Sequence, residues 1–514
     1  MKALWRLLCG EDCDIVGQNR VQCVGGTVDS GSASDAETGD LTCGMNPRIG
    51  APSHGEVLPP REHGVDGLAQ RPLDGAKPRL ARPAEEPGSV VFQRQLDDHD
   101  VTSWRRMSTT QRYDLYSHDF RLTTHDTYAR MREEAPVHIQ PGLDGETPIW
   151  FVTRYDDVVA LLTDNERFVV DPKRALTPAE FEAHAAEFAT DERASENLLA
   201  KDGEDHRRLR RLVTKAFTPR IVEGLRPRIQ QIADELIDEV EAQGSMELVD
   251  DFAFPLPITV IAELLGIPIE DRERFRVWSS NVVMPALTPE DRELARRRGD
   301  EFIAYLDDLF AQRRADPTDD LVSALVQAED GGDTLSENEL SSMVVLLIVA
   351  GHETTVSLIT NAVYALLTHP EQLVALRADT SLMASAVEEL LRFDSPVERS
   401  ITRWVAADTE LGGQMLRRGE LVIAVLGSAN RDLARFENAD TLDLTRANNK
   451  HVGFGRGPHY CVGAPLARLE AGIALETLFR RLPNLRLEIA DDDLYWRPIP
   501  LFRSLASLPV AWDV

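Results

Sequence analysis

The stretch Phe454-Gly-Arg-Gly-Pro-His-Tyr-Cys-Val-Gly463 determines how the rest of the chain is interpreted, because its glycines surround a single cysteine. Cys461 is the only cysteine after Cys43. Glycine tolerates positive φ angles and lets the backbone approach a flat ligand closely, which larger residues prevent. A tight loop of this composition can hold the sulfur end-on, so the stretch indicates a metal ligand.

A helix is expected directly after this loop. From Ala464 to Phe479 apolar residues recur three and four positions apart, which is a helical period. Cys461 therefore stands where a loop enters a helix, and backbone N–H groups at such a position favour a thiolate over a thiol. A free cysteine is more often an inert core residue, so the remainder of the chain has to decide between the two interpretations.

Three segments of the chain resemble the cytochrome P450 family, and they occur in the expected order. The cysteine loop matches the haem-ligand pattern F-x-x-G-x-[RH]-x-C-x-G at Phe454, Gly457, His459, Cys461 and Gly463. Ala350-Gly-His-Glu-Thr-Thr355 resembles the oxygen-activating helix of the family, and Glu389-Leu-Leu-Arg392 resembles its E-x-x-R pair.

The resemblance implies both an architecture and a cofactor. The fold would be mainly α with small β-sheets, and one long central helix would lie over haem b. Cys461 would be the axial thiolate ligand of the iron. Phe454, Gly463 and Ala350 would contact the haem.

Composition restricts the class of protein. The chain has 514 residues, of which 43% are hydrophobic, and a formal net charge of −30 at pH 7. It lacks the basic character of nucleic-acid-binding proteins, so no nucleic-acid partner is expected. The N-terminal apolar run is too short and too charged for a secretory segment, and no stretch approaches the length of a membrane span. The expected location is the cytoplasm.

Residues 1–103 differ from the remainder of the chain. They are rich in Gly, Pro, Ser and Asp without an apolar period, so we expect them to be disordered. A mis-assigned translation start, a flexible arm and a targeting extension are the interpretations, in that order. Residues 104–514 are expected to form one haem-thiolate domain. Cys9, Cys13, Cys23 and Cys43 lack the spacing of zinc and iron–sulfur sites and are left unassigned.

The pattern beyond residue 104 is mainly helical. Strands are predicted at Ile149–Thr153 and Glu420–Leu426 from their β-branched and aromatic content. Helices are predicted at Ile221–Glu241, Pro257–Leu265, Asp291–Arg314 and Ser385–Phe393. The longest helix is predicted from Ser336, where Glu339 completes a capping box, to about His369. It is apolar on nearly all sides, which indicates a central buried helix.

The middle of that helix carries a glycine, a carboxylate and two hydroxyls. Burying such groups needs a reason, although threonine hydroxyls often only bond the carbonyl one turn earlier. The resemblance implies that Glu353 and Thr354 are the acid–alcohol pair that delivers protons during oxygen activation. The family more often has Asp at the first position. A zinc-peptidase interpretation of His352-Glu353 fails, because Val356 stands where a second histidine is required.

Glu389 and Arg392 are three residues apart, a spacing that is ordinary for a surface ion pair of small energy. The resemblance implies a buried pair on the thiolate side of the haem, joined by Arg446, with a structural role.

Haem carries two propionates, which need fixed cations or strong donors. The resemblance assigns this role to His206 and Arg210 on one helix, to Arg403, and to His459 in the cysteine loop. By composition alone, the run His206–Val213 is equally consistent with a solvated basic face.

The same run suggests how electrons arrive. Arg207, Arg208, Arg211 and Lys215 add positive charge to an acidic chain and would attract an acidic partner. No flavin or nicotinamide fingerprint follows a strand, so electrons have to come from another protein. By resemblance the donor would be a ferredoxin with its NAD(P)H-linked ferredoxin reductase.

The substrate pocket is expected on the far side of the haem. We predict that it is lined by Leu347, Ala350, Val397, Ser400, Leu501 and Phe502. Their mostly apolar character predicts a lipophilic small molecule such as a macrolide, a terpenoid or an aromatic compound, although the charged loop Asp171–Asp202 would also suit a polar substituent. Two alternatives to a monooxygenase stay open: a peroxide-driven peroxygenase, and a non-catalytic haem-binding carrier, sensor or partner subunit.

Overall fold

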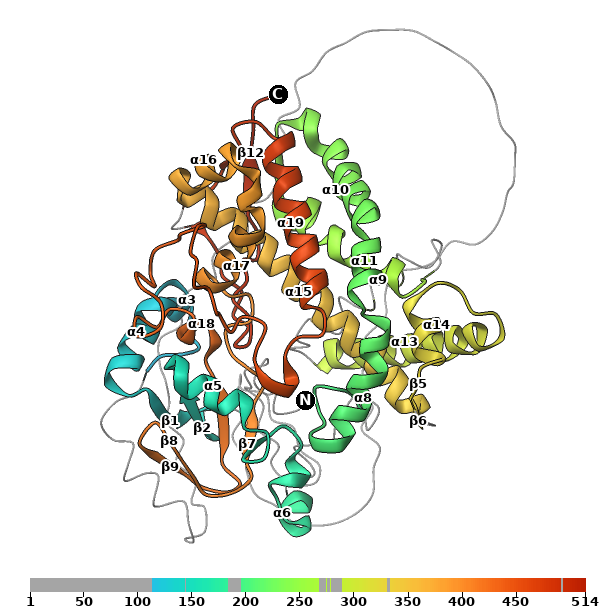
Figure 1. Ribbon diagram of the computed structural model, residues 1–514, viewed down its shortest axis with the longest axis vertical. Coiled ribbons are helices and arrows are strands. Elements are labelled where there is room, and N and C mark those ends of the chain that lie inside the picture. Colours follow the sequence, from blue (N-terminus) through green and yellow to red (C-terminus); the bar gives the residue numbers. More distant parts are fainter. Residues whose placement is uncertain are drawn as a thin grey trace, which may run out of the picture. The chain divides into compact units, whose positions relative to one another are not determined.

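The computed structural model describes residues 113–514, except 144, 184–195, 268–273, 275–277, 279–288, 331–332 and 491–492. The predictions for residues 1–103, including the four N-terminal cysteines, lie outside the described residues, as does much of the loop Asp171–Asp202. The described part is mainly helical and contains small β-sheets, as the sequence predicts (Figure 1).

Helices occur along the whole described range of the chain. The α-helices are α3 His118–Leu122, α4 Thr124–Glu134, α5 Tyr155–Thr163, α6 Pro178–Ala183, α8 Gly203–Ala216, α9 Pro219–Gly224, α10 Arg226–Val240, α11 Pro255–Leu264, α13 Pro289–Ala315, α14 Leu321–Val326, α15 Glu337–Thr368, α16 Pro370–Ala378, α17 Met383–Phe393, α18 Leu426–Ala429 and α19 Ala464–Arg481. Short 3₁₀ or π turns are η1 Pro172–Arg174, η3 Glu241–Gln243, η4 Val249–Ala253, η6 Thr380–Leu382 and η7 Gly457–His459.

The central helix is α15, and its ends lie where the sequence predicts. The Ser336 hydroxyl accepts a hydrogen bond from the Glu339 N–H at 3.2 Å, and the Glu339 carboxylate accepts one from the Ser336 N–H at 2.8 Å. This capping box satisfies two of the free N–H groups of the first turn. The helix ends before Pro370, which cannot continue it. The expectation that no stretch approaches the length of a membrane span is wrong, because α15 is long and apolar enough to cross one. However, 67% of its most apolar window is buried inside the protein.

Five helices pack together in the middle of the fold. α15 packs against α11, α17 and α19, and α19 also lies alongside α10 (Figure 1). Their apolar faces form the largest core cluster, which explains why the periodic segments of the sequence become helices buried on one face or on all faces.

The main sheet joins distant parts of the chain. Its order is β1 (Val137–Pro141), β2 (Pro148–Val152), β10 (Leu421–Ala424), β7 (Arg403–Val405), β3 (Phe168–Val169). The two predicted strands are β2 and β10, and they pair in parallel with Leu421 opposite Ile149. A second sheet has the order β11 (Arg486–Leu487), β12 (Pro509–Ala511), β4 (Ser245–Glu247), and two hairpins pair β5 (Glu329–Asp330) with β6 (Asp333–Thr334) and β8 (Thr409–Leu411) with β9 (Gln414–Leu416).

One helix prediction is wrong in detail. The segment predicted as a single helix, Ile221–Glu241, contains two helices, α9 and α10, that meet at Leu225. Pro227 has no N–H to donate and occupies the first turn of α10, where none is needed. The other predicted helices are present with ends shifted by two residues or fewer.

Candidate functional site

The cysteine loop, which contains η7 and leads into α19, is held by backbone hydrogen bonds among its own residues. The Cys461 N–H donates to the Phe454 carbonyl at 3.0 Å, and the Gly455 N–H donates to the Val452 carbonyl at 2.8 Å. Gly457 has φ +70°, and a Cβ there would lie 2.6 Å from the Leu162 carbonyl oxygen at the end of α5. Only glycine fits at this position, because both the dihedral angle and the contact exclude a side chain.

Cys461 is the only cysteine among the residues that the structure describes, and its side chain is exposed. It precedes the first residue of α19 by three positions. Although solvent reaches the side chain, the surrounding protein is dense enough for burial to raise the pKa of the thiol. The N–H groups of Gly463 and Ala464 and the guanidinium of Arg210 act in the opposite direction without overcoming burial. The N–H groups at the start of α19 favour the thiolate, as the sequence predicts, but burial outweighs them in the protein alone. A coordinated metal ion would remove the proton.

A cluster of basic side chains lies beside the loop. The rings of His206 and His459 are 4.3 Å apart between centroids, and His459 Nε2 is 3.4 Å from Asp202 Oδ1. Arg210 donates to the Pro458 carbonyl at 3.3 Å, and Arg403 donates to the Phe168 carbonyl at 3.1 Å. The structure thus brings the four predicted anion-binding side chains close to the Cys461 loop.

Two nitrogen atoms of this cluster form no hydrogen bond within the described residues. Among the described residues, His206 Nε2 and Arg403 Nε are buried without a hydrogen-bond partner. Burial lowers the pKa of His206 to about 4, with His459 and Arg210 adding to the effect, and burial also lowers the pKa of Arg403 to about 10. A buried cation without enough acceptors is costly, and an anionic ligand such as a carboxylate would relieve that cost.

These features fit haem. Within the described ranges no group of three or more His, Cys, Asp or Glu side chains could hold a metal ion. A single cysteine ligand suits an iron that brings its other ligands in a porphyrin ring, and unpartnered donors beside the loop suit the propionates of that ring.

Sequence reasoning missed Asp202, which organises the basic cluster. Its Oδ2 accepts hydrogen bonds from the N–H groups of Val170 and Asp171 at 2.7 and 2.8 Å, and its other oxygen contacts His459. Hydrogen bonds from His459 and from these two N–H groups lower the pKa of Asp202 against the opposing effect of burial. The only local signal is an Asp before Gly203 at the start of a basic helix, which is typical of an N-cap, but the side chain bonds the two residues that follow β3 instead of the helix.

The middle of α15 interrupts an otherwise buried helix. Ala350 and Gly351 are exposed, and Thr354 is half-buried and donates to the Ala350 carbonyl at 2.7 Å. Glu353 is only 3% exposed, and its carboxylate pairs with Arg497 near the C-terminus. Arg497 is a second residue that sequence reasoning missed, since nothing in the local pattern links position 497 to position 353.

A carboxyl group is buried where α19 meets α15. Glu470 is 2% exposed, and burial raises its pKa well above the ordinary value. The hydrogen bond from the Thr355 hydroxyl lowers it by less. Glu470 on α19 therefore faces Thr355, the residue that follows Thr354 on α15.

The E-x-x-R pair is fully buried and joined by a third charge. Arg392 bonds both oxygens of Glu389 at 2.8 Å and donates to the carbonyls of Asn430 and Ala439 at 2.8 and 2.7 Å. Arg446 Nε lies 3.0 Å from Glu389 Oε2. All three nitrogens of the Arg392 guanidinium are hydrogen-bonded, so the charge is tolerated without solvent.

The predicted pocket residues fall into two groups. Leu347 lies on α15, one turn before Ala350, and is buried. Val397 and Phe502 form an isolated antiparallel bridge, and the Glu398 N–H donates to the Leu501 carbonyl at 2.9 Å. The Ser400 N–H donates to the Ala424 carbonyl at 2.8 Å, at the end of β10. The structure therefore unites the segments around positions 397 and 502, which lie about a hundred residues apart in the sequence.

The basic residues of α8 are largely neutralised by neighbours. Arg207 donates to Glu204 at 2.6 Å, Arg211 lies 3.6 Å from the same carboxylate, and Arg208 pairs with Glu339. The side chain of Lys215 lies outside the described residues. The local positive charge is weaker than the sequence suggests, because three of its arginines share two carboxylates.

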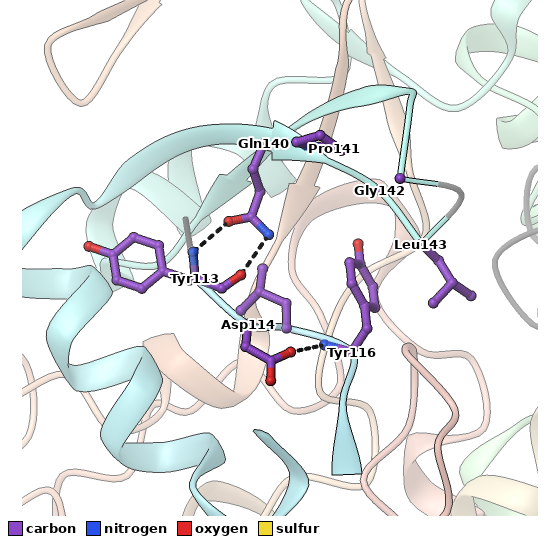
Figure 2. Close-up of a pocket in the computed structure, with 9 residues that line it drawn as sticks. Tyr113, Asp114, Tyr116, Gln140, Pro141, Gly142 and Leu143 are labelled. Carbon is purple, nitrogen blue, oxygen red and sulfur yellow. Dashed lines mark hydrogen bonds between the residues drawn. The ribbon is translucent and has the colours of Figure 1, made fainter. Parts of the chain in front are cut away.

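A surface pocket of about 420 Å³ lies elsewhere, at the start of the described chain (Figure 2). The Gln140 side-chain amide bonds both the N–H and the carbonyl of Tyr113, at 3.2 and 3.1 Å, and Asp114 accepts from the Tyr116 N–H. None of its lining residues belongs to the predicted site, so we assign it no part in the chemistry.

Comparisons with known proteins agree with the family resemblance of the sequence motifs. A family model described as "Cytochrome P450" matches residues 269–490. Cytochrome P450 107B1 of Saccharopolyspora erythraea is 47% identical over 412 residues, covering 79% of this chain and 99% of the relative. The mycinamicin IV hydroxylase/epoxidase of Micromonospora griseorubida is 44% identical over 395 residues, covering 76% and 96%. The crystal structure of a myxobacterial cytochrome P450, CYP267B1, with myristic acid is 46% identical and superposes with a TM-score of 0.71, covering 78% and 99%.

Proposed function

The chain belongs to the cytochrome P450 family, and from that premise we propose that it inserts one oxygen atom of O₂ into a lipophilic small molecule, with Cys461 as the thiolate ligand of its haem b. The protein is a monooxygenase, as its hydroxylase relatives are. One observation carries the assignment of Cys461. Its sulfur is exposed at the start of α19, in a loop whose Gly457 leaves no room for a side chain.

Haem with a thiolate ligand supplies the cleavage of the O–O bond and the transfer of one oxygen atom. The protein contributes position and charge. His206, Arg210, Arg403 and His459 would bind the propionates, and Asp202 would orient His459. The unpartnered nitrogens of His206 and Arg403 support this role.

Glu353 and Thr354 would move protons during the reaction. The Thr354 hydroxyl lies at the exposed part of α15, where it can hold a proton at Oγ1, and Glu353 is the adjacent acid that can replace that proton. Arg497 keeps the Glu353 carboxylate in one orientation inside the protein. General acids contribute by being held within reach of the proton acceptor.

The substrate class is proposed from the wall residues and from relatives. Leu347, Val397, Leu501 and Phe502 are apolar, and Ser400 adds one hydroxyl. One relative is named as a mycinamicin IV hydroxylase/epoxidase and another as a 6-deoxyerythronolide B hydroxylase. We therefore infer hydroxylation or epoxidation of a macrolide-sized lipophilic product of secondary metabolism, in the cytoplasm. Electrons would come from a ferredoxin and its NAD(P)H-linked reductase.

The decisive experiment compares the wild-type protein with Cys461→Ser after loading with haem. The wild type is expected to show the Soret shift that carbon monoxide causes in reduced thiolate-ligated haem, and the variant to lose it. Tyr116→Phe, far from the loop in sequence and at the surface pocket, is the control and should keep the shift. An unchanged spectrum in Cys461→Ser would overturn the ligand assignment. Product formation with hydrogen peroxide but not with a ferredoxin system would instead establish the peroxygenase.

A further inference from the structure

The segment Ile499–Arg503 carries Leu501 and Phe502, two predicted wall residues of the pocket. On one side it pairs with residues 396–398: the Glu398 N–H donates to the Leu501 carbonyl, and the Arg503 N–H donates to the Pro396 carbonyl, both at 2.9 Å. On another side Asn361 of α15 donates to the Arg503 carbonyl at 2.9 Å. These few bonds join two short extended pieces that belong to no larger sheet, and such pieces are prone to local opening.

A guanidinium from the other end of the described chain binds two further carbonyls of this segment. Arg121, at the end of α3, donates to the Ile499 carbonyl at 2.8 Å and, at a longer 3.4 Å, to the Phe502 carbonyl. The same group donates to Glu398 Oε2 at 2.9 Å. Arg503 in turn donates to the Arg121 carbonyl at 3.0 Å. One side chain therefore spans the segment from Ile499 to Phe502 and also holds the segment with which it pairs.

The charges around Arg121 are enclosed by protein. Arg121 and Glu398 are each 1% exposed. Glu398 also accepts from the Tyr128 hydroxyl and lies 3.3 Å from Arg399 Nε. Replacing buried ion pairs by apolar residues often costs no stability, so their energetic benefit is small; what they can provide is one defined arrangement of the groups they join. Here the groups joined are the two halves of a proposed pocket wall.

We propose that Arg121 is a positioning residue for substrate recognition, which sets the shape of the pocket wall at Leu501 and Phe502 by binding the carbonyls of their segment and Glu398. This inference rests on the proposed function, which places those two side chains in the wall. Arg121 is too buried to contact a substrate itself, so it acts only through the backbone that it holds.

Arg121→Lys tests the proposal, because lysine keeps the charge but cannot reach several acceptors at once. Arg132→Lys is the matched control. Arg132 lies on α4, is 8% exposed, and donates from Nη1 to the carbonyl and hydroxyl oxygens of Ser428. Within the described part of the chain it forms no hydrogen bond with residues 499–503. The haem-loaded ferric proteins are titrated with imidazole, which needs only the iron, and with clotrimazole, which is large enough to meet the pocket walls.

Arg121→Lys should weaken clotrimazole binding about tenfold, the effect of losing one charged hydrogen bond, while imidazole binding changes less than about twofold. Arg132→Lys should leave the ratio of the two affinities unchanged. Equal changes for both ligands, or the same selective loss in Arg132→Lys, would overturn the proposal. If Arg121→Lys does not fold, Glu398→Gln replaces it. This variant should also lose clotrimazole binding selectively, and equal changes for clotrimazole and imidazole would again overturn the proposal.

Hydrogen exchange gives an answer that is independent of haem. The Glu398 and Arg503 amides, which bond across the two segments, should exchange faster in Arg121→Lys than in the wild type and Arg132→Lys. Unchanged exchange counts against the proposal. If the proposed function is wrong, the wild-type protein itself will give no azole-induced shift of the Soret band. That result is distinct from a failure of the Arg121 proposal, in which the wild type gives the shift.

Discussion

Glu353, in the middle of α15, forms an ion pair with Arg497, which lies 144 residues later in the chain. The carboxylate is nearly fully buried, whereas the guanidinium keeps 21% of its side chain exposed. Arg497 also belongs to the C-terminal segment that carries the proposed pocket wall, since its N–H donates to the Ser504 carbonyl at 2.8 Å. Arg497 therefore links Glu353, the proposed proton donor, to the segment that carries the proposed pocket wall.

Removing one member of this pair should cost more than removing both. Arg497→Gln leaves a buried carboxylate without its cation, which we expect to lower the free energy of unfolding by about 1–3 kcal/mol. The double variant with Glu353→Gln should recover part of that loss, because the uncompensated charge is gone. Denaturant unfolding of the wild type and the three variants measures the coupling energy. Strictly additive effects would show that the two side chains are not paired in solution.

Thr354→Ala should separate oxygen consumption from product formation. The haem spectrum should be retained, but a larger share of the NAD(P)H consumed should appear as hydrogen peroxide, because the hydroxyl that holds the proton is missing. Thr368→Ala is the control: its hydroxyl makes the same bond to the carbonyl four residues earlier, at 2.9 Å, but at the end of α15. If the two variants release the same share of peroxide, Thr354 has no special role.

Several other E-x-x-R sequences occur in the chain, and one of them provides a matched comparison. Glu293 and Arg296 on α13 have the same spacing as Glu389 and Arg392, but their side chains are 56% and 61% exposed. Arg296→Ala should cost less than about 1 kcal/mol, as exposed ion pairs do. Arg392→Ala should cost about 3–5 kcal/mol or prevent folding, since it leaves Glu389 buried beside Arg446 alone.

Thermal unfolding of the two variants, supplemented by the fraction of protein that retains haem, checks this difference. Comparable losses at the two sites would mean that burial does not distinguish them.

Glu470 should make stability depend on pH above the acidic range. Its pKa is raised in the folded protein, so the native state binds more protons than the unfolded state once the pH exceeds about 4.5, the ordinary glutamate value. Its contribution is therefore full at lower pH and is lost as the pH rises toward the folded pKa. Glu470→Gln, which keeps a neutral group of the same shape, should be relatively more stable at pH 8 than at pH 5 when compared with the wild type.

Denaturant midpoints at several pH values measure this effect. A constant difference between Glu470→Gln and the wild type across that range would show that Glu470 does not titrate abnormally.

Local sequence signals predicted the elements well. The capping box at Ser336 and the proline after His369 define both ends of α15 because they act within a turn of the chain. Strands β2 and β10 were predicted from their branched residues. The division between α9 and α10 was not predicted, since the apolar period continues across Leu225 while the backbone does not.

The order of motifs and the single late cysteine, which depend only on covalent sequence, were enough to indicate the family and the proposed iron ligand. Sequence could not reveal Asp202 beside His459, Arg497 on Glu353, or Arg121 on the Ile499 carbonyl. It also overstated the free positive charge of α8, because Arg207, Arg208 and Arg211 pair with carboxylates. Local preferences follow from neighbouring residues, whereas burial and charge pairing depend on which distant segments meet, and only the tertiary structure decides that.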